Sequence, residues 1–283
     1  MKIGQFKRPW WFKKAPWAPI VILAFLLFIV IFADVVSPHS PTTINLPNRL
    51  APPGSEGHLL GTDSLGRDLM TRLFYGGRVS LAVSVIVLLL AGTTGLAVGI
   101  VSGYLGGKVD AVMMRVVDIF LSFPPILLAI IMAVSLGPGF RTIIIAISLT
   151  YWSRFARVIR AEVLQIKEQE FIALARVAGC SPLYIMVRHI LPNVLDTHLV
   201  IMSLEIGMVI RLESTLSFLG AGIPPPTPSW GRMVGDGRAY IDTAWWIALV
   251  PGGALAMVIL SFNMLGDWLR DVMDPQLRGV MGA

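Results

Sequence analysis

The stretch VSLAVSVIVLLLAGTTGLAVGIV, residues 79–101, decides the fold class of this chain. It contains no Asp, Glu, Lys or Arg, and its only polar side chains are those of Ser and Thr. Crossing the ~30 Å hydrocarbon core of a bilayer takes about 20 residues of helix, so the stretch is long enough to span a membrane. A helix that is apolar on every side needs lipid or a protein interior around it. The stretch therefore predicts a transmembrane helix.

Four further stretches have the same character, namely residues 18–36, 116–136, 199–219 and 245–265. A shorter one, residues 141–155, is polar at both ends. We include it because a sixth crossing returns the chain to the side where the basic segment after it belongs. Charged residues make up only 14% of the chain, whereas soluble domains carry ~25%. These features predict an all-α, polytopic membrane protein with six transmembrane helices in a single domain, residues 1–283.

Lysine and arginine predict how the chain lies across the membrane, because cytoplasmic segments carry an excess of them. Five basic side chains and no acid precede the first helix: Lys2, Lys7, Arg8, Lys13 and Lys14. The loop 154–196 carries Arg154, Arg157, Arg160, Lys167, Arg176 and Arg188. Both termini and this loop are therefore expected in the cytoplasm, with loops 37–78 and 221–244 outside. Residues 32–37 lack the Ala-x-Ala pattern of a signal-peptide cleavage site, which favours a retained first helix.

The residues offer no plausible enzyme or metal site. The four histidines are scattered without zinc-site spacing, and Cys180 is the only cysteine. The stretch GYLGGK, residues 103–108, resembles a phosphate-binding loop, but Ser102 and Val109 stand where that motif needs Gly and Ser or Thr. We therefore expect no cofactor in this chain, and any ATP and Mg²⁺ to be bound by partner subunits. The net charge of +6 fits the positive-inside bias rather than nucleic-acid binding.

Two features inside the spans predict how the helices are shaped and packed. Ala91, Gly95, Gly99 and Gly103 recur at every fourth residue, which places small residues on one helix face and favours close approach of another helix. Pro124-Pro125 removes backbone donors from the third span and should kink or break it. A kinked helix can line a cavity, so this pair is a candidate for lining one as well as for a purely structural kink.

The loop 154–196 contains a predicted helix–turn–helix. Residues 168–178 favour a helix, and Gly179 is placed to end it in the left-handed conformation. Ser181 can cap a second helix, Pro182 suits its first turn, and Pro192 should disrupt it. A helix pair facing the cytoplasm has the shape of a docking element. A surface loop lying on lipid headgroups explains the same pattern equally well.

The spacing of this segment resembles the EAA loop of ABC importer permeases. In that pattern a glycine precedes the Leu-Pro pair as Gly179 precedes Leu191 and Pro192 here. Ala175 matches the second alanine of the pattern, whereas Ala173 and Leu174 replace its glutamate and first alanine. These departures resemble the peptide-type subfamily. The resemblance implies an ATPase-coupling site at residues Ala173, Leu174, Ala175, Gly179, Cys180, Ser181, Leu191 and Pro192.

Other stretches resemble the dipeptide/oligopeptide/nickel permease family, in its shorter, C-type form. They are GTDSLGRD at 61–68, YGGRVSL at 75–81, LSFLG at 216–220, PPTPSWG at 225–231, NMLGDWLRD at 263–271 and DPQLR at 274–278. The resemblance implies the type I permease fold of an ATP-driven importer in the bacterial inner membrane. It also implies a homologous second permease, two ATPase subunits and an extracytoplasmic substrate-binding protein as partners. The cargo it implies is a dipeptide or oligopeptide, with nickel, glutathione or another small solute as alternatives.

Charges inside the spans leave a rival interpretation open. A self-contained secondary transporter would need coupling groups in the membrane, and Asp118, Glu205, Arg211 and Glu213 are candidates. A docking loop argues against it, and we expect Asp118 to pair simply with Arg115. Arg211 and Glu213 point ~200° apart on a helix, so each needs its own partner. Either Arg211 forms an ion pair with another helix or the partner permease, or it faces the pathway and binds a cargo carboxylate.

Overall fold

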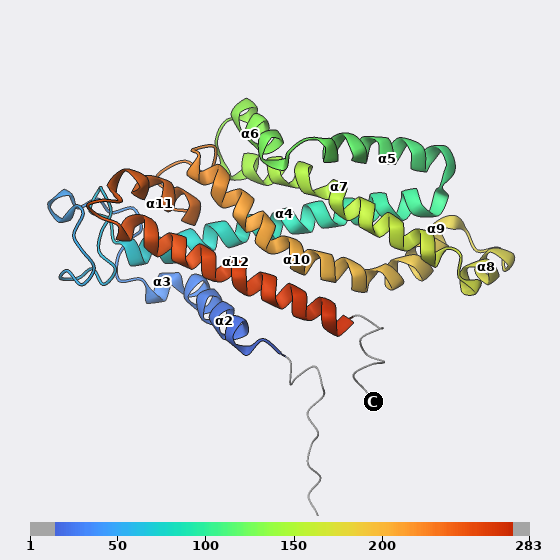
Figure 1. The fold of residues 1–283 in the computed structure, drawn as a ribbon, viewed down its shortest axis with the longest axis horizontal. Helices are drawn as coiled ribbons and strands as arrows, with labels where there is room; N and C mark the ends of the chain where they lie inside the picture. Colours follow the sequence, from blue (N-terminus) through green and yellow to red (C-terminus); the bar gives the residue numbers. More distant parts are fainter. Residues whose placement is uncertain (1–14, 274–283) are drawn as a thin grey trace, which may run out of the picture.

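A computed structural model describes residues 15–273, and these residues are almost entirely helical (Figure 1). The helices longer than one turn are α2 (Trp17–Ile31), α4 (Leu69–Leu105), α5 (Gly107–Ser122), α6 (Pro125–Leu136), α7 (Phe140–Ile166), α8 (Glu170–Val177), α10 (Leu191–Phe218), α11 (Trp230–Gly237) and α12 (Trp246–Met273). The short helices are α3 (Ala33–Val36), α9 (Pro182–Ile185), a π-helical turn at Met186–Ile190, and 3-10 turns at Leu46–Asn48 and Arg238–Tyr240. No strand forms between residues 15 and 273. The all-α prediction is confirmed.

Three of the helices, α4, α7 and α12, are long and apolar enough to cross a membrane, and the pair α5–α6 counts as a fourth if its two parts form one bent span. The predicted first span corresponds to α2, which is shorter, with α3 following it. The predicted fifth span lies in α10, which is long but carries Asp196, Glu205, Arg211 and Glu213. The chain is therefore a polytopic α-helical membrane protein.

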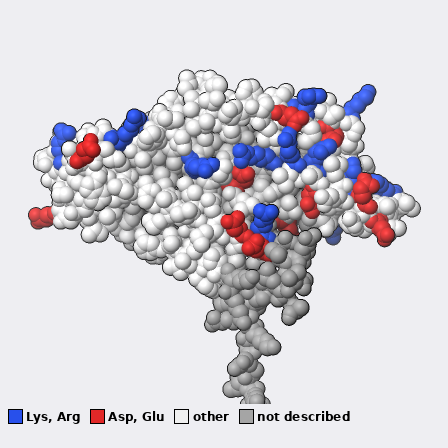
Figure 2. All heavy atoms as spheres, viewed as in Figure 1, with Lys and Arg blue, Asp and Glu red and all other residues white. Residues whose placement is uncertain are grey.

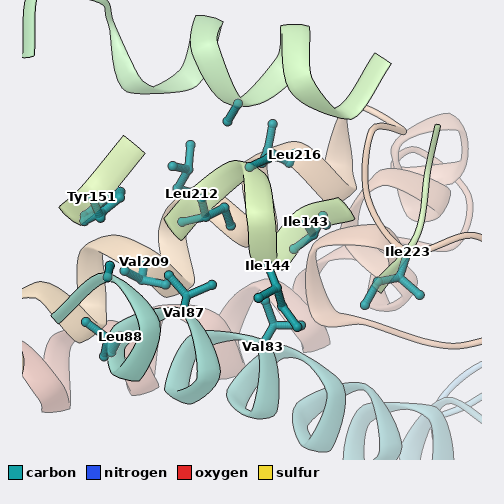
Figure 3. Close-up of a cluster of buried hydrophobic side chains, with 14 of the residues drawn as sticks. Val83, Val87, Leu88, Ile143, Ile144, Tyr151, Val209, Leu212, Leu216 and Ile223 are labelled. Atoms are coloured by element: carbon teal, nitrogen blue, oxygen red, sulfur yellow. The ribbon is translucent and has the colours of Figure 1, made fainter. Parts of the chain in front are cut away.

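The long helices α4, α7, α10 and α12 run lengthwise through the molecule, with α5 and α6 along one side and α2 along the other (Figure 1). We name the two ends of this bundle after the elements found there. The loop end holds residues 37–68 and α11, and the hairpin end holds α8 and α9. Between them lies an apolar core in which α4, α7 and α10 meet (Figure 3). Its labelled members include Val87, Ile144, Tyr151, Val209 and Leu212.

The small-residue face of α4 packs against α7, as its spacing predicts. A Cβ built on Gly99 would lie 2.8 Å from the carbonyl oxygen of Ala156, and one on Gly103 would lie 2.8 Å from the Cβ of Val163. Contacts below 3.0 Å do not occur between real side-chain carbons and their neighbours, so α7 approaches α4 only because these positions lack a side chain.

The Pro124-Pro125 pair breaks the third span, which confirms that prediction. Helix α5 ends at Ser122, α6 begins at Pro125, and their axes differ by 88°. Both prolines lie at or near the surface of the molecule, with Pro124 exposed and Pro125 half-buried. The break turns α6 across the upper side of the bundle in Figure 1.

Charged side chains gather towards the hairpin end on the face shown in Figure 2, and much of the rest of that face is uncharged. Such an uncharged band is what a lipid-facing surface requires. The basic residues Lys2, Lys7, Arg8, Lys13 and Lys14 and the motif at 274–278 lie outside the described residues.

Candidate functional site

The hairpin end is built by a helix, a tight turn and a second helix, as the sequence predicts. Gly179 ends α8 with a backbone φ of +77°, the left-handed conformation that glycine adopts without a Cβ penalty. The Ser181 hydroxyl then accepts a hydrogen bond from the Tyr184 N–H at 3.3 Å, and Pro182 occupies the first turn of α9. The predicted helix over 168–178 begins slightly later, at Glu170.

One face of this hairpin is anchored in the bundle. Ile172 and Ala175 of α8 are buried, and they join Ile185 of α9 in an apolar cluster with Ile159 and Val163 of α7. The guanidinium of Arg176 lies 5.5 Å above the Tyr104 ring of α4. The hairpin is therefore held as a packed element rather than as a loose loop.

The opposite face of the hairpin is apolar yet exposed. Phe171, Leu174 and Val177 are 41%, 69% and 86% exposed and follow one another at a spacing of three along α8, and Leu183 of α9 is 67% exposed. We call these four residues the hairpin patch. Large apolar side chains gathered on an exposed part of the surface are typical of a contact site. The sequence analysis named Leu174 but missed Phe171 and Val177. Their spacing of three residues on either side of Leu174 indicates that all three share one helix face.

The predicted coupling residues divide between the two faces. Ala173, Leu174, Gly179 and Ser181 are exposed, so a partner could touch them directly. Ala175 is buried and anchors α8 to the bundle. Cys180 and Leu191 are half-buried, and Pro192 is exposed.

Pro192 does not end the second helix, contrary to our expectation. The chain stays helical from Pro182 to Phe218, passing through the π-helical turn at Met186–Ile190 and then into α10, where Pro192 lies in the first turn. A π turn shifts the backbone hydrogen bonds by one residue, and a proline in the first turn of a helix has no N–H that needs an intrahelical partner. The π-helical turn therefore changes the backbone hydrogen-bonding pattern before Pro192, and the helix continues without a break.

Helix α7 extends to Ile166, so the loop predicted at 154–196 is largely helical at both ends. Three arginines in the second half of α7 pair with acids on other helices. Arg154 pairs with Glu205 of α10 at 3.5 Å, and Arg160 pairs with Asp110 of α5 at 2.5 Å. Arg157 pairs with Asp118 of α5. The expected pair between Asp118 and Arg115 is therefore wrong, because the neighbouring helix supplies the partner.

Arg211 and Glu213 point to opposite sides of α10, as their spacing predicts. Glu213 is fully buried, and its carboxylate accepts hydrogen bonds from the hydroxyls of Ser217 at 2.8 Å and Ser214 at 3.3 Å. Arg211 is exposed, and its side chain contacts the sulfur of Met208. No carboxylate among residues 15–273 lies within ion-pair distance of Arg211.

Comparison with known proteins identifies the family. The model described as "Binding-protein-dependent transport system inner membrane component" matches residues 95–279, and "N-terminal TM domain of oligopeptide transport permease C" matches residues 13–53. A putative peptide transport system permease of Brucella suis is 44% identical, over 89% of this chain and 86% of its own. A dipeptide transport system permease of Bacillus subtilis is 39% identical, over 94% and 83%. A nickel transport system permease of Escherichia coli is 40% identical, over 91% and 93%.

Among solved structures, the MetNI methionine ABC transporter in an inward-facing conformation matches with a TM-score of 0.59 and 19% identity, over 73% of this chain and 98% of that one. At this identity the match concerns the fold alone. It agrees with the type I permease fold that the sequence predicts. The first family model covers the hairpin and the helices from α5 to α12, and the relatives are similar over most of the chain. This chain therefore belongs to the inner membrane components of binding-protein-dependent transport systems.

Proposed function

We propose that this chain is the permease subunit of an ATP-driven importer and forms half of a translocation pathway together with a homologous second permease. A binding protein outside delivers the cargo, and two ATPase subunits bind ATP and Mg²⁺ on the cytoplasmic side. The relatives are named as permeases of transport systems, which supports a non-catalytic role for this chain. Their family membership also argues against a self-contained secondary transporter.

The observation that carries the proposal is the hairpin patch. Its four apolar side chains stand on helices that the bundle holds rigidly, at the end of the molecule opposite the long loop 37–68. A soluble ATPase subunit that offers an apolar groove would bury them, and burial of a large aliphatic side chain contributes about 1.5–3 kcal/mol. In this arrangement Ala173, Leu174, Gly179 and Ser181 contact the ATPase, while Ala175, Cys180, Leu191 and Pro192 support them.

The cargo we propose is a dipeptide or oligopeptide. Relatives of nearly equal similarity are named for peptide, dipeptide and nickel transport, so nickel is the second candidate. The exposed cation Arg211 favours a peptide, because a guanidinium binds a free carboxylate and repels a metal cation. We propose that Arg211 faces the shared pathway. The buried Glu213 and the break at Pro124-Pro125 shape the helices around that pathway.

Replacement of Leu174 by Asp tests the docking role. The side chain is 69% exposed, so the permease should fold and insert normally, whereas a buried charge in the contact should abolish ATPase binding. Copurification of the tagged permease with its ATPase subunits measures the effect. The matched control is Val109→Asp, because Val109 is 40% exposed near the same end of the molecule but lies outside the hairpin patch. Equal ATPase recovery with both variants would contradict the proposal.

A further inference from the structure

Three potential metal ligands converge at the loop end, although their positions in the sequence are far apart. They are His39, which follows α3, His58 in the middle of the loop, and Asp68, which caps the N-terminus of α4. One ligand atom of each lies within 4.8 Å of the others. Sequence spacing gave no sign of this cluster, since only the folding of the loop back onto α4 brings the two imidazoles together.

The two imidazoles approach the same carboxylate oxygen. The Nδ1 of His58 lies 2.9 Å from Oδ1 of Asp68, and the Nδ1 of His39 lies 3.9 Å from that oxygen. The rings are stacked with their centroids 5.0 Å apart. With metal–ligand bonds of 2.0–2.1 Å, the ligand atoms of a tetrahedral zinc ion are about 3.3 Å apart. The His58 distance is shorter than this spacing and the His39 distance is longer, and all three ligand atoms lie within 4.8 Å of one another. Rotations of the two imidazoles would therefore bring both nitrogens and Oδ1 to bonding distance from one ion.

The surrounding charges leave Oδ1 available for a cation. The other oxygen of Asp68, Oδ2, accepts the Thr71 N–H at 2.8 Å and so keeps the carboxylate in place. The nearby cations Arg67 and Arg72 form salt bridges with a different acid, Asp63, with Nε–Oδ2 distances of 2.7 and 3.3 Å. Because Asp68 and His58 are buried and His39 is 40% exposed on its side chain, an ion could enter from the His39 side.

We propose that His39, His58 and Asp68 bind a resident divalent transition-metal ion of the zinc type, with water in the fourth position. Imidazole and carboxylate are ligands that zinc accepts, and three protein ligands with one open position are a familiar arrangement. The ion tethers the segment that leaves the first helix to the loop and to the start of α4. Binding displaces the proton that joins His58 to Asp68, since both nitrogens must be unprotonated to bind the metal.

The test uses the full-length chain, purified in detergent, stripped with a chelator and titrated with zinc chloride by calorimetry. We expect one saturable site per chain, and zinc should raise the thermal unfolding midpoint because it binds the folded state. His39→Ala should weaken zinc binding by more than about 10-fold, the loss that even outer-sphere partners of a metal can cause. Cobalt added in place of zinc should give visible d–d absorption in the wild type and lose it in this variant.

His39→Ala is the informative change because the partly exposed His39 side chain lies too far from Asp68 for a hydrogen bond and contacts the His58 ring only by stacking. The chelator-treated variant should therefore unfold close to the wild-type temperature. His39→Gln provides a second variant with a polar side chain and the same expected loss. His189→Ala, which removes an imidazole at the hairpin end, should bind zinc as the wild type does. Absence of a saturable site, or equal zinc affinity in the His39 and His189 variants, would overturn the proposal.

Discussion

Gly95 of α4 lies directly against the backbone of Trp152 in α7, so that a Cβ built on Gly95 would lie 2.5 Å from the Trp152 carbonyl oxygen. The contact lies beside the core cluster where α4, α7 and α10 meet. Backbone cannot yield as a flexible side chain does, and the two helices must separate if the glycine gains a side chain.

Gly95→Ala should therefore lower the stability of the permease by about 1–3 kcal/mol, the usual cost of overpacking. The thermal unfolding midpoint of the purified chain measures this loss. Gly253→Ala is the matched control, because Gly253 also lies in a long helix but a Cβ there meets nothing within 4 Å. An alanine at 253 should be neutral or slightly stabilising. Equal midpoints for the two variants would show that α4 and α7 do not depend on this contact.

Gly179→Val should uncouple ATP hydrolysis from transport. The residue has a φ of +77°, and a Cβ there meets nothing within 4 Å, so the penalty comes from the backbone alone. Left-handed geometry costs an ordinary residue about 1–2 kcal/mol, and more when it is β-branched. The measurement compares ATPase stimulation with cargo uptake in reconstituted vesicles. Gly179→Asn should retain coupling, because asparagine tolerates this conformation. Normal uptake with valine would show that the turn does not transmit the signal.

The expected topology places Ser55 and Gly235 outside and Cys180 inside. Ser64 and Arg67 of the loop line one pocket together with Arg232 and Asp236 of α11, so the loop and α11 lie at the same end of the bundle. The hairpin that carries Cys180 lies at the other end. Reporter fusions at the three positions should give external signals at 55 and 235 and an internal signal at 180. An internal signal at 235 would contradict six crossings with cytoplasmic termini.

Arg211→Gln should reduce uptake of cargo with a free carboxylate and spare an amidated analogue of the same peptide. Arg211 is exposed, and no described acid pairs with it, so its loss should leave thermal stability and basal ATPase activity unchanged. Arg211→Lys, which keeps the charge but not the planar fork of donors, should retain part of the uptake. If the variant complex instead is less stable and takes up both cargoes equally poorly, Arg211 contacts the partner permease and does not bind cargo.

Local features of this chain were predictable because their causes are local. Gly179, Ser181 and the Pro124-Pro125 break act on their own turn of backbone, and each behaves as the sequence indicates. The extent of α7 was not predicted, because Arg154, Arg157 and Arg160 placed its second half in a separate cytoplasmic segment instead of in a continuation of the span. Their charges are matched by acids on α5 and α10, and no pattern within α7 reveals those partners.

The arrangement of residues at the loop end could not be predicted either, because it also depends on contacts between distant parts of the chain. His39 and His58 are separated by a proline- and glycine-rich stretch, whose path depends on long-range hydrogen bonds such as the one from the Arg72 guanidinium to the Pro41 carbonyl oxygen at 3.0 Å. The small-residue face of α4 likewise predicted a close neighbour but not which helix it would be. Both features required the tertiary fold.

The uninterrupted helix from Pro182 to Phe218 has a mechanical consequence. At 1.5 Å per residue, the helical path from the exposed Leu183 to Arg211 is about 42 Å long. A helix of this length acts as a lever arm, so that a tilt of a few degrees imposed at the hairpin sweeps the far end sideways by several ångströms. A displacement of the hairpin is thus passed to the core segment of α10 through continuous helical backbone, by way of the π-helical turn at Met186–Ile190 and Pro192.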